Sequence, residues 1–191
     1  PLAPLPDPAA PLDRAAAVRL ARECELCEHP GCTAACPAGI DVRNVLRRLE
    51  AGNVAGAARA LRETNALAEA CGYLCGSNPP CERRCNRLAF SDRPVRIADL
   101  QAWLCREAGA AGWAPAYAGG PCGTAAVVGA GPAGLACAYY LARAGYQVSL
   151  LDRAPEPGVS LLAYEESVLP AEAARRDIDG VLAAGVSFTG G

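Results

Sequence analysis

Two dense cysteine runs constrain this chain more than any other feature of its sequence. The runs are Cys24-x2-Cys27-x4-Cys32-x3-Cys36-Pro37 and Cys75-x5-Cys81-x3-Cys85, and Cys71 stands just before the second run. Such spacings are typical of ligands around iron–sulfur clusters, and a cysteine directly before proline at the end of a run often binds the second cluster of a pair. Because each cluster would then take ligands from both runs, we expect two clusters.

Three other interpretations of the cysteines compete with this one. Zinc sites built from cysteines usually contain two CxxC pairs, whereas only Cys24 and Cys27 form such a pair here. A disulfide framework is typical of short secreted chains, and we find no charged segment followed by an apolar one, the pattern of a signal peptide. Redox chemistry at one CxxC pair would leave the other cysteines without a role. Iron–sulfur binding is the favoured hypothesis, with zinc second.

Composition sets broad limits on function. The chain has 191 residues, 52% hydrophobic content and a formal net charge of −2, which fits one ordinary domain or two small ones. Nothing in this charge predicts nucleic acid or an anionic membrane surface as a partner, and no apolar run approaches membrane-spanning length. We expect a cytoplasmic protein, because thiols stay reduced there. The chain lacks methionine and ends on Gly190-Gly191 after an apolar stretch, so we expect a piece of a longer protein.

The first half of the sequence has the pattern of a helical domain. Residues 1–12 form a proline-rich tail, and residues 13–107 are predicted to be all-helical and stapled by clusters. One helix is predicted from Asp13 to about Glu23. Asp41 and Asn53 are predicted N-caps of the next two helices. Helical periodicity predicts three buried faces: Val42, Val45, Leu46 and Leu49; Val54, Ala57, Ala58 and Leu61; and, after Pro94, Ile97, Leu100 and Leu104.

The second half changes to an alternation of strands and helices. An Ala/Gly/Pro-rich linker is expected over residues 108–123. We predict a buried strand at 125–128, a second strand at 147–151, a helix at 171–184 and a short strand at 186–188. This order implies a parallel sheet. The predicted fold class is therefore multidomain, α followed by α/β, with residues 124–191 forming the incomplete N-terminal part of a Rossmann-like FAD/NAD(P)-binding domain.

A glycine-rich turn follows the first predicted strand and opens a helix. Its sequence, Gly129-Ala130-Gly131-Pro132-Ala133-Gly134, fits GxGxxG. In such a turn the first glycine allows a tight bend, the second lets a pyrophosphate approach the backbone, and the third lets helix and strand pack closely. The helix N-terminus offers free N–H groups to phosphates, and Asp152 would accept hydrogen bonds from ribose hydroxyls. The turn predicts a bound dinucleotide, but the motif alone does not separate FAD from NAD.

Taken together, these motifs resemble the N-terminal region of the small subunit of bacterial glutamate synthase, which dihydropyrimidine dehydrogenase and related NAD(P)H-dependent flavoproteins share. The resemblance covers nearly all of the chain after the proline-rich start. Besides the cysteine runs and the glycine turn, the matching residues are Ile40-Asp41, Asn65, Cys71-Gly72, Glu82, Pro94-Val95, Val127-Val128, Leu135 and Leu169-Pro170.

The resemblance implies a set of cofactors and ligands. One 4Fe–4S cluster would be bound by Cys24, Cys27, Cys32 and Cys85, and the other by Cys36, Cys75 and Cys81. In dihydropyrimidine dehydrogenase a glutamine at the place of Gln101 is the eighth ligand, whereas simple counting of thiols prefers Cys71. We favour Gln101, since a non-cysteine ligand is a known way to tune cluster potential. The dinucleotide would be FAD, and NAD(P)H would be bound by sequence outside this chain.

The resemblance further implies an electron-input module that passes electrons from FAD through the clusters to a larger partner subunit or domain. The protein would hold and tune the cofactors, and we assign no catalytic residue. Two alternatives stay open. One is a non-enzymatic electron-relay subunit with a partial nucleotide fold, and the other is a zinc-stabilised interaction domain.

Overall fold

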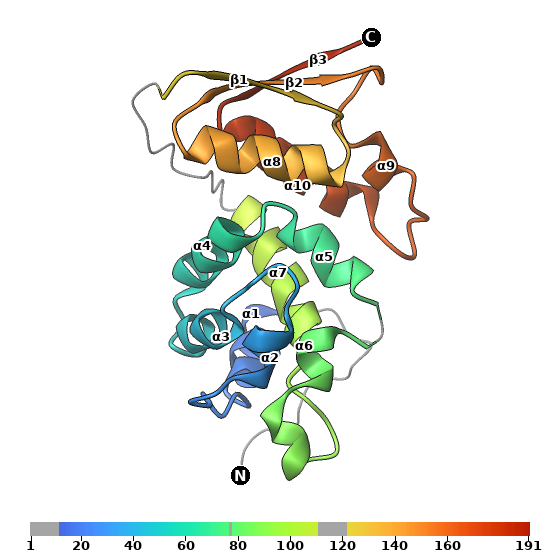
Figure 1. Ribbon diagram of the computed structural model, residues 1–191. Coiled ribbons are helices and arrows are strands. Elements are labelled where there is room, and N and C mark those ends of the chain that lie inside the picture. Colours follow the sequence, from blue (N-terminus) through green and yellow to red (C-terminus); the bar gives the residue numbers. More distant parts are fainter. Residues whose placement is uncertain (1–11, 77, 111–121) are drawn as a thin grey trace.

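The chain folds into a helical part and an α/β part. The computed structural model describes residues 12–76, 78–110 and 122–191, and in it a sheet with its helices sits on one end of a group of helices (Figure 1). This order confirms the predicted fold class, α followed by α/β. Within these ranges no helix is both long enough and apolar enough to cross a bilayer.

Helices in the first part begin where local sequence rules predict them. Asp13, Asp41 and Asn53 each accept a hydrogen bond from a backbone N–H three residues ahead, at 2.6, 3.1 and 2.9 Å, so the three helices start at N-caps. The elements are α1 (Arg14–Ala21), α2 (Gly31–Ala35), α3 (Val42–Glu50), α4 (Val54–Thr64), α5 (Ala68–Leu74), α6 (Pro80–Arg83), η1 (Asn86–Ala89) and α7 (Ile97–Ala110).

Helix α7 organises the core of the helical part. It contacts α1, α4, α5 and α6, and its apolar face is buried as predicted, with Leu100 and Leu104 at 1% and 0% exposure. The predicted faces of α3 and α4 are also buried, except that Val54 is only half-buried. Gly72 lets α5 approach α7 closely, because a Cβ there would lie 3.0 Å from the Ala102 Cβ. This approach fixes the position of the helix that carries Cys71.

The second part is a parallel sheet with helices on one face. Its elements are β1 (Thr124–Val128), α8 (Pro132–Arg143), β2 (Gln147–Asp152), α9 (Val159–Leu162), α10 (Ala171–Ala183) and β3 (Val186–Gly190). The described strands pair in the order β1-β2-β3, and Leu150 lies between Val127 and Phe188 in the register. Helices α8 and α10 cover the face that contains Val148 and Leu150 (Figure 1).

Two details differ from the predictions. The strand predicted to be buried at 125–128 is half exposed, because β1 is an edge strand of the described sheet and alternates its side chains between the helix-covered face and the open one. Val128, at 84% exposure, lies on the open face. Helix α7 runs to Ala110, three residues into the predicted linker. Residues 111–121 of that linker and residues 1–11 of the predicted tail lie outside the described residues.

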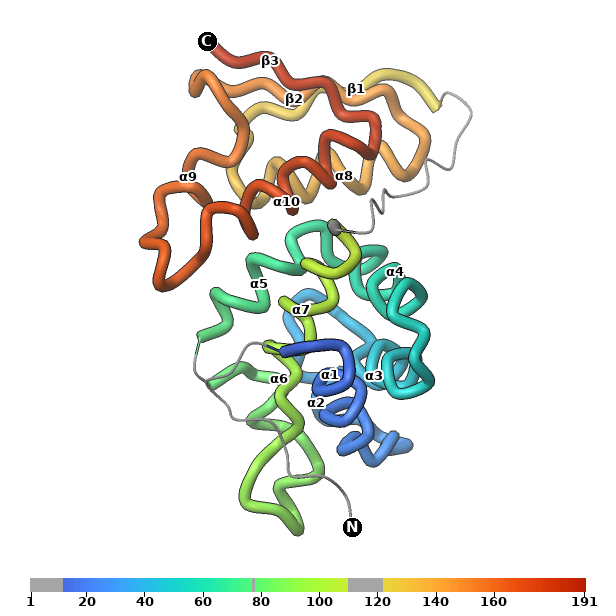
Figure 2. The backbone as a smooth tube through the Cα atoms, turned by 180° about the vertical axis from the view of Figure 1, so that it is seen from behind, coloured from blue at the N-terminus to red at the C-terminus, as the bar shows by residue number. Residues whose placement is uncertain are grey.

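A set of four charged residues, three buried and one half-buried, joins the two parts and is here called the junction. Arg62 and Glu69 come from the helical part, and Arg176 and Asp177 come from α10. Asp177 accepts from Arg62 Nη1 at 2.8 Å and from the Ala70 N–H at 2.8 Å, and Glu69 accepts from Arg176 Nη2 at 2.7 Å. Both views show α5 next to α10 (Figures 1 and 2). Asp177 thus caps the start of α5 from the other part of the chain.

Candidate iron–sulfur and dinucleotide sites

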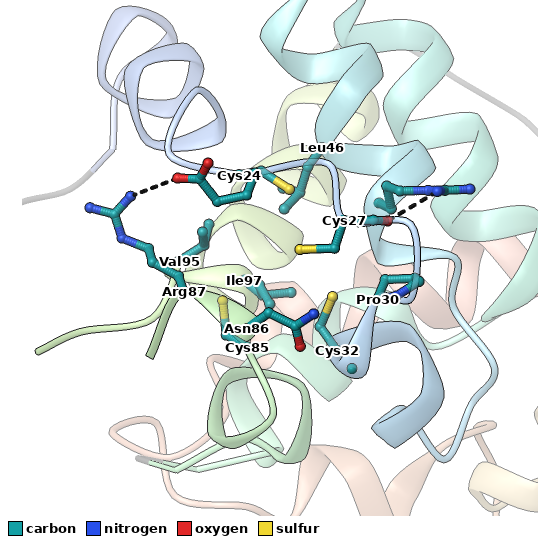
Figure 3. Close-up of a pocket in the computed structure, with 13 residues that line it drawn as sticks. Cys24, Cys27, Pro30, Cys32, Leu46, Cys85, Asn86, Arg87, Val95 and Ile97 are labelled. Atoms are coloured by element: carbon teal, nitrogen blue, oxygen red, sulfur yellow. Dashed lines mark hydrogen bonds and ion pairs between the residues drawn. The ribbon is translucent and has the colours of Figure 1, made fainter. Parts of the chain in front are cut away.

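Four of the predicted cluster ligands surround one space, here called the first pocket. Cys24, Cys27 and Cys32 come from the first cysteine run, and Cys85 comes from the turn between α6 and η1. Their thiols point toward a common centre between the two segments (Figure 3). Leu46, Val95 and Ile97 form an apolar wall. The structure thus brings together the four residues that the resemblance assigned to one cluster.

Gly31 explains how two segments more than fifty residues apart can meet here. A Cβ at Gly31 would lie 2.4 Å from the Arg84 carbonyl oxygen, so only glycine lets the start of α2 touch the end of α6. The Asn86 Nδ2 donates to the His29 carbonyl oxygen at 3.1 Å, so a hydrogen bond also joins the two segments next to Gly31. Sequence reasoning missed both residues, although a glycine directly before Cys32 was a usable signal.

The backbone of the first pocket is shaped around its thiols. Leu26 has a φ of 48°, a conformation uncommon for a residue with a side chain, and its N–H donates to the Cys24 thiol. Burial raises the pKa of Cys24 and of Cys32, and neighbouring thiols raise both further. Thiolates crowded in this way need a positive partner, and metal binding supplies one while releasing protons. The donor set therefore fits an iron–sulfur cluster.

A second pocket contains the remaining predicted ligands. Cys36 ends α2, Cys75 ends α5, Cys81 lies in α6, and Gln101 lies in α7. Asn65, Cys71, Pro79 and Pro80 also line this space. Burial, followed by the charge of Glu82, raises the pKa of the Cys81 thiol to about 12. Three thiols and one oxygen donor, or four thiols, are thus available here, which again fits a 4Fe–4S cluster.

The two candidates for the eighth ligand, Gln101 and Cys71, both line the second pocket. Gln101 donates from Nε2 to the Ala68 carbonyl oxygen at 2.6 Å, which leaves Oε1 as its oxygen donor. Cys71 lines the same pocket one helix away. Gln101 therefore stays a prediction. Across residues 12–76, 78–110 and 122–191, no three His, Cys, Asp or Glu side chains lie close enough together to hold a single metal ion.

The glycine turn has the geometry that its sequence predicts. Gly129 has a φ of 101°, Gly131 is the N-cap of α8, and Pro132 occupies the first turn. A Cβ at Gly134 would lie 1.7 Å from the Gly129 carbonyl oxygen, so the helix can pack on the turn only with glycine there. A Cβ at Gly131 would meet only Ser160 Oγ at 3.6 Å, which leaves room for a ligand beside the backbone.

Asp152 is engaged with the backbone of this turn. Its Oδ2 accepts from the Ala130 N–H at 2.6 Å and its Oδ1 from the Ala154 N–H at 2.8 Å. These two bonds lower the pKa of Asp152. The carboxylate fixes the turn after β1. Its contact with a ribose stays a prediction, and so does the role of Ala133 beside the phosphates. Sequence reasoning missed Gly158. Its φ of 74° and its contact with Ile178 require glycine, and its N–H donates to the Ala130 carbonyl oxygen.

These sites define a class of protein in which an iron–sulfur domain is followed by a nucleotide-binding Rossmann-like unit. Residues 6–113 match the family of dihydropyrimidine dehydrogenase domain II, 4Fe-4S cluster. Residues 127–176 match an NAD(P)-binding Rossmann-like domain. Because the first match covers more than half of the chain, the protein belongs to the dihydropyrimidine dehydrogenase domain II family.

Individual relatives agree with this membership and confirm the resemblance. The NAD-dependent dihydropyrimidine dehydrogenase subunit PreT of Salmonella typhimurium strain LT2 is 34% identical over 83% of this chain and 40% of its own length. The glutamate synthase [NADPH] small chain of Escherichia coli K12 is 34% identical over 78% of this chain and 32% of its own. The chain thus spans about 40% or less of the length of these curated relatives.

Among solved structures, 6-hydroxypseudooxynicotine amine oxidase from Pseudomonas geniculata N1 matches 76% of this chain and 20% of its own. Its TM-score of 0.30 and identity of 22% are too low to support an argument about function.

Proposed function

We propose that this chain is the electron-input module of an NAD(P)H-dependent FAD/iron–sulfur oxidoreductase of the glutamate synthase small-subunit type. When bound, FAD and two 4Fe–4S clusters supply the redox chemistry, which links hydride transfer to single-electron transfer. The chain's own residues hold these groups, orient them and exclude water. NAD(P)H is bound by sequence outside this chain, and a larger subunit or domain accepts the electrons. We place the protein in the cytoplasm, where its thiols stay reduced.

One observation carries the proposal, namely that the two cysteine runs are interleaved in space. Cys85 of the second run lies with the first three cysteines of the first run, and Cys36 of the first run lies with Cys75 and Cys81. An exchange of the cysteine before proline is the pattern of two-cluster ferredoxins. The two pockets therefore support two clusters more strongly than spacing alone.

The positions of the pockets support an order of electron flow. Asn65 and Cys71 line the second pocket, and their neighbours Ala66, Leu67 and Ala70 pack in the core of the α/β part. Helix α2, next to the first pocket, lies farther from the sheet than α5 does (Figure 1). The second pocket is therefore the nearer one to the dinucleotide turn, and the first pocket is on the exit side.

Metal analysis after anaerobic reconstitution tests the proposal. We expect about eight irons and eight sulfides per chain. The variants Cys24→Ser and Cys75→Ser should each lose about half of the iron, because they change different pockets. Cys137→Ser is the matched control, since Cys137 is exposed on α8 and lines neither pocket, and it should keep all of the iron. An iron-free chain loaded with zinc would contradict the proposal.

Both Asp152 oxygens already accept backbone hydrogen bonds, from Ala130 and Ala154, which favours a second candidate, the non-enzymatic electron relay. In that case the Rossmann-like part would be structural and the clusters alone would transfer electrons. Titration of the reconstituted chain with FAD, followed by flavin fluorescence, separates the two. Tight binding of one FAD per chain supports the electron-input module, and absence of binding supports the relay.

A further inference from the structure

Asn65 carries a buried amide N–H donor that makes no hydrogen bond of ordinary geometry within the described residues. It lies between α4 and α5, is 8% exposed and lines the second pocket. Its Oδ1 accepts from the Leu67 N–H at 3.0 Å, which fixes the turn into α5. Its Nδ2 is fully buried, and no polar atom of the part of the chain that the structure describes accepts from it with ordinary hydrogen-bond geometry. Native structures rarely leave such a donor unsatisfied, and each case needs an explanation.

The orientation of this amide follows from its one bond. Only the carbonyl end of an asparagine can accept from the Leu67 N–H, so the other end must be the NH2 group. That group lies on the sulfur-lined side of the pocket, because Asn65 lines the pocket beside Cys71 and is close enough to favour its thiolate. An N–H donor beside three or four thiols is suited to a sulfur acceptor.

We propose that Asn65 donates an N–H···S hydrogen bond to a sulfur of the cluster in the second pocket and thereby raises the reduction potential of that cluster. The proposal rests on the proposed function, since it needs the cluster to be present. Reduction adds one negative charge to the cluster, and a hydrogen bond to sulfur stabilises the more negative state. Asn65 is thus a positioning and tuning residue rather than a ligand.

The location of Asn65 gives this tuning a purpose. The second pocket is the nearer one to the α/β part, so its cluster is the first to receive electrons in the proposed order. A raised potential favours electron transfer into that cluster. Thr33 Oγ1 is a comparable buried group that makes no hydrogen bond of ordinary geometry within the described residues, and it lies close enough to Cys32 of the first pocket to favour that thiolate. The two clusters therefore have different donors, a neutral amide in one case and a hydroxyl in the other.

A redox titration of the reconstituted full chain, followed by electron paramagnetic resonance, tests the proposal. Asn65→Ser keeps a hydroxyl that can accept from the Leu67 N–H but removes the amide donor. We expect the equilibrium constant for reduction of one cluster to fall about tenfold, which is about 59 mV for one electron, and the other cluster to be unchanged. Asn53→Ser is the matched control, because Asn53 makes the same kind of turn bond to Gly56 outside both pockets.

Three outcomes would overturn the inference: unchanged potentials in Asn65→Ser with full iron content, an equal shift of both clusters, or the same shift in Asn53→Ser. If the variant loses its iron, pulsed electron paramagnetic resonance of the wild-type chain with 15N-labelled asparagine decides instead. A 15N coupling to the second cluster supports the bond, and its absence contradicts it. A wild-type chain without iron would refute the proposed function itself, which the iron analysis shows separately.

Discussion

Replacing Asp177 with alanine tests whether the junction holds the helical and α/β parts together. Asp177 is fully buried, with Oδ1 2.8 Å from Arg62 Nη1 and Oδ2 2.8 Å from the Ala70 nitrogen. The variant removes the 2.8 Å ion pair with Arg62, whose side chain is 5% exposed. It also removes the cap of α5, the helix that carries Cys71 and ends at Cys75.

The expected cost follows from these contacts. Removing one partner of a buried ion pair costs about 3–5 kcal/mol, and losing a helix cap costs about 0.5–2 kcal/mol. Both effects come from the same carboxylate, so they overlap. Glu69 Oε2 lies 3.8 Å from Arg62 Nη2 and keeps part of the compensation. We therefore expect a loss near the lower end, about 3 kcal/mol of unfolding free energy.

Urea unfolding of the reconstituted chain, followed by circular dichroism, measures this loss. The matched control is Glu156→Ala, which breaks a pair with Arg175 whose side chains are 52% and 58% exposed and should cost less than about 1 kcal/mol. Because α5 leads to the second pocket, Asp177→Ala should also bind its second cluster more weakly. If Asp177→Ala unfolds like the control and keeps its iron, the junction does not hold the parts together.

Three further predictions concern the same residues and the glycine turn. Burial raises the pKa of Asp177 from 3.8 to about 6 despite Arg62, so the native state binds more protons than the unfolded chain between these values. The pH-dependent part of the stabilisation by Asp177 should therefore be fully present below pH 3.8 and be lost as the pH rises through about 6. The difference in urea midpoint between the wild type and Asp177→Ala, measured across this pH range, should show this slope. Gly134→Ala would place a Cβ 1.7 Å from the Gly129 carbonyl oxygen and should disrupt the α/β part. Gly131→Ala should keep the wild-type circular dichroism spectrum and bind FAD at least about tenfold more weakly. Cys105→Ala should keep all of the iron and lose only about 1 kcal/mol of stability, because Cys105 is buried in the core outside both pockets.

Local rules made the helical part predictable from sequence. Asp41 and Asn53 cap helices because each is followed by a helical pattern of apolar residues, and both the cap and the pattern lie within a few residues. The cysteine runs are also local signals, since their spacing indicates iron–sulfur binding. The meeting of Cys85 with the first run came from family resemblance and not from spacing alone.

Long-range contacts were the part that sequence could not supply. Arg62 and Asp177 are separated by 115 residues, and each alone resembles an ordinary surface charge on a helix. The exposure of Val128 depends on which strands and helices cover β1. The apolar sequence of β1 does not reveal this. The role of Gly31 likewise depends on the Arg84 carbonyl oxygen, more than fifty residues away.

The segment from Arg62 to Ala70 explains why the two parts are joined by buried charges. Arg62 and Glu69 bind α10 through carboxylate–guanidinium pairs, while Asn65, between them, lines the second pocket. An apolar contact of similar size could give equal stability, because desolvation offsets much of what a buried pair gains. Charged pairs with short bonds, however, are satisfied in only one relative orientation. The same nine residues thus determine both how the glycine turn sits over the helical part and where the second pocket lies, so the electron path of the proposed function would have one fixed geometry.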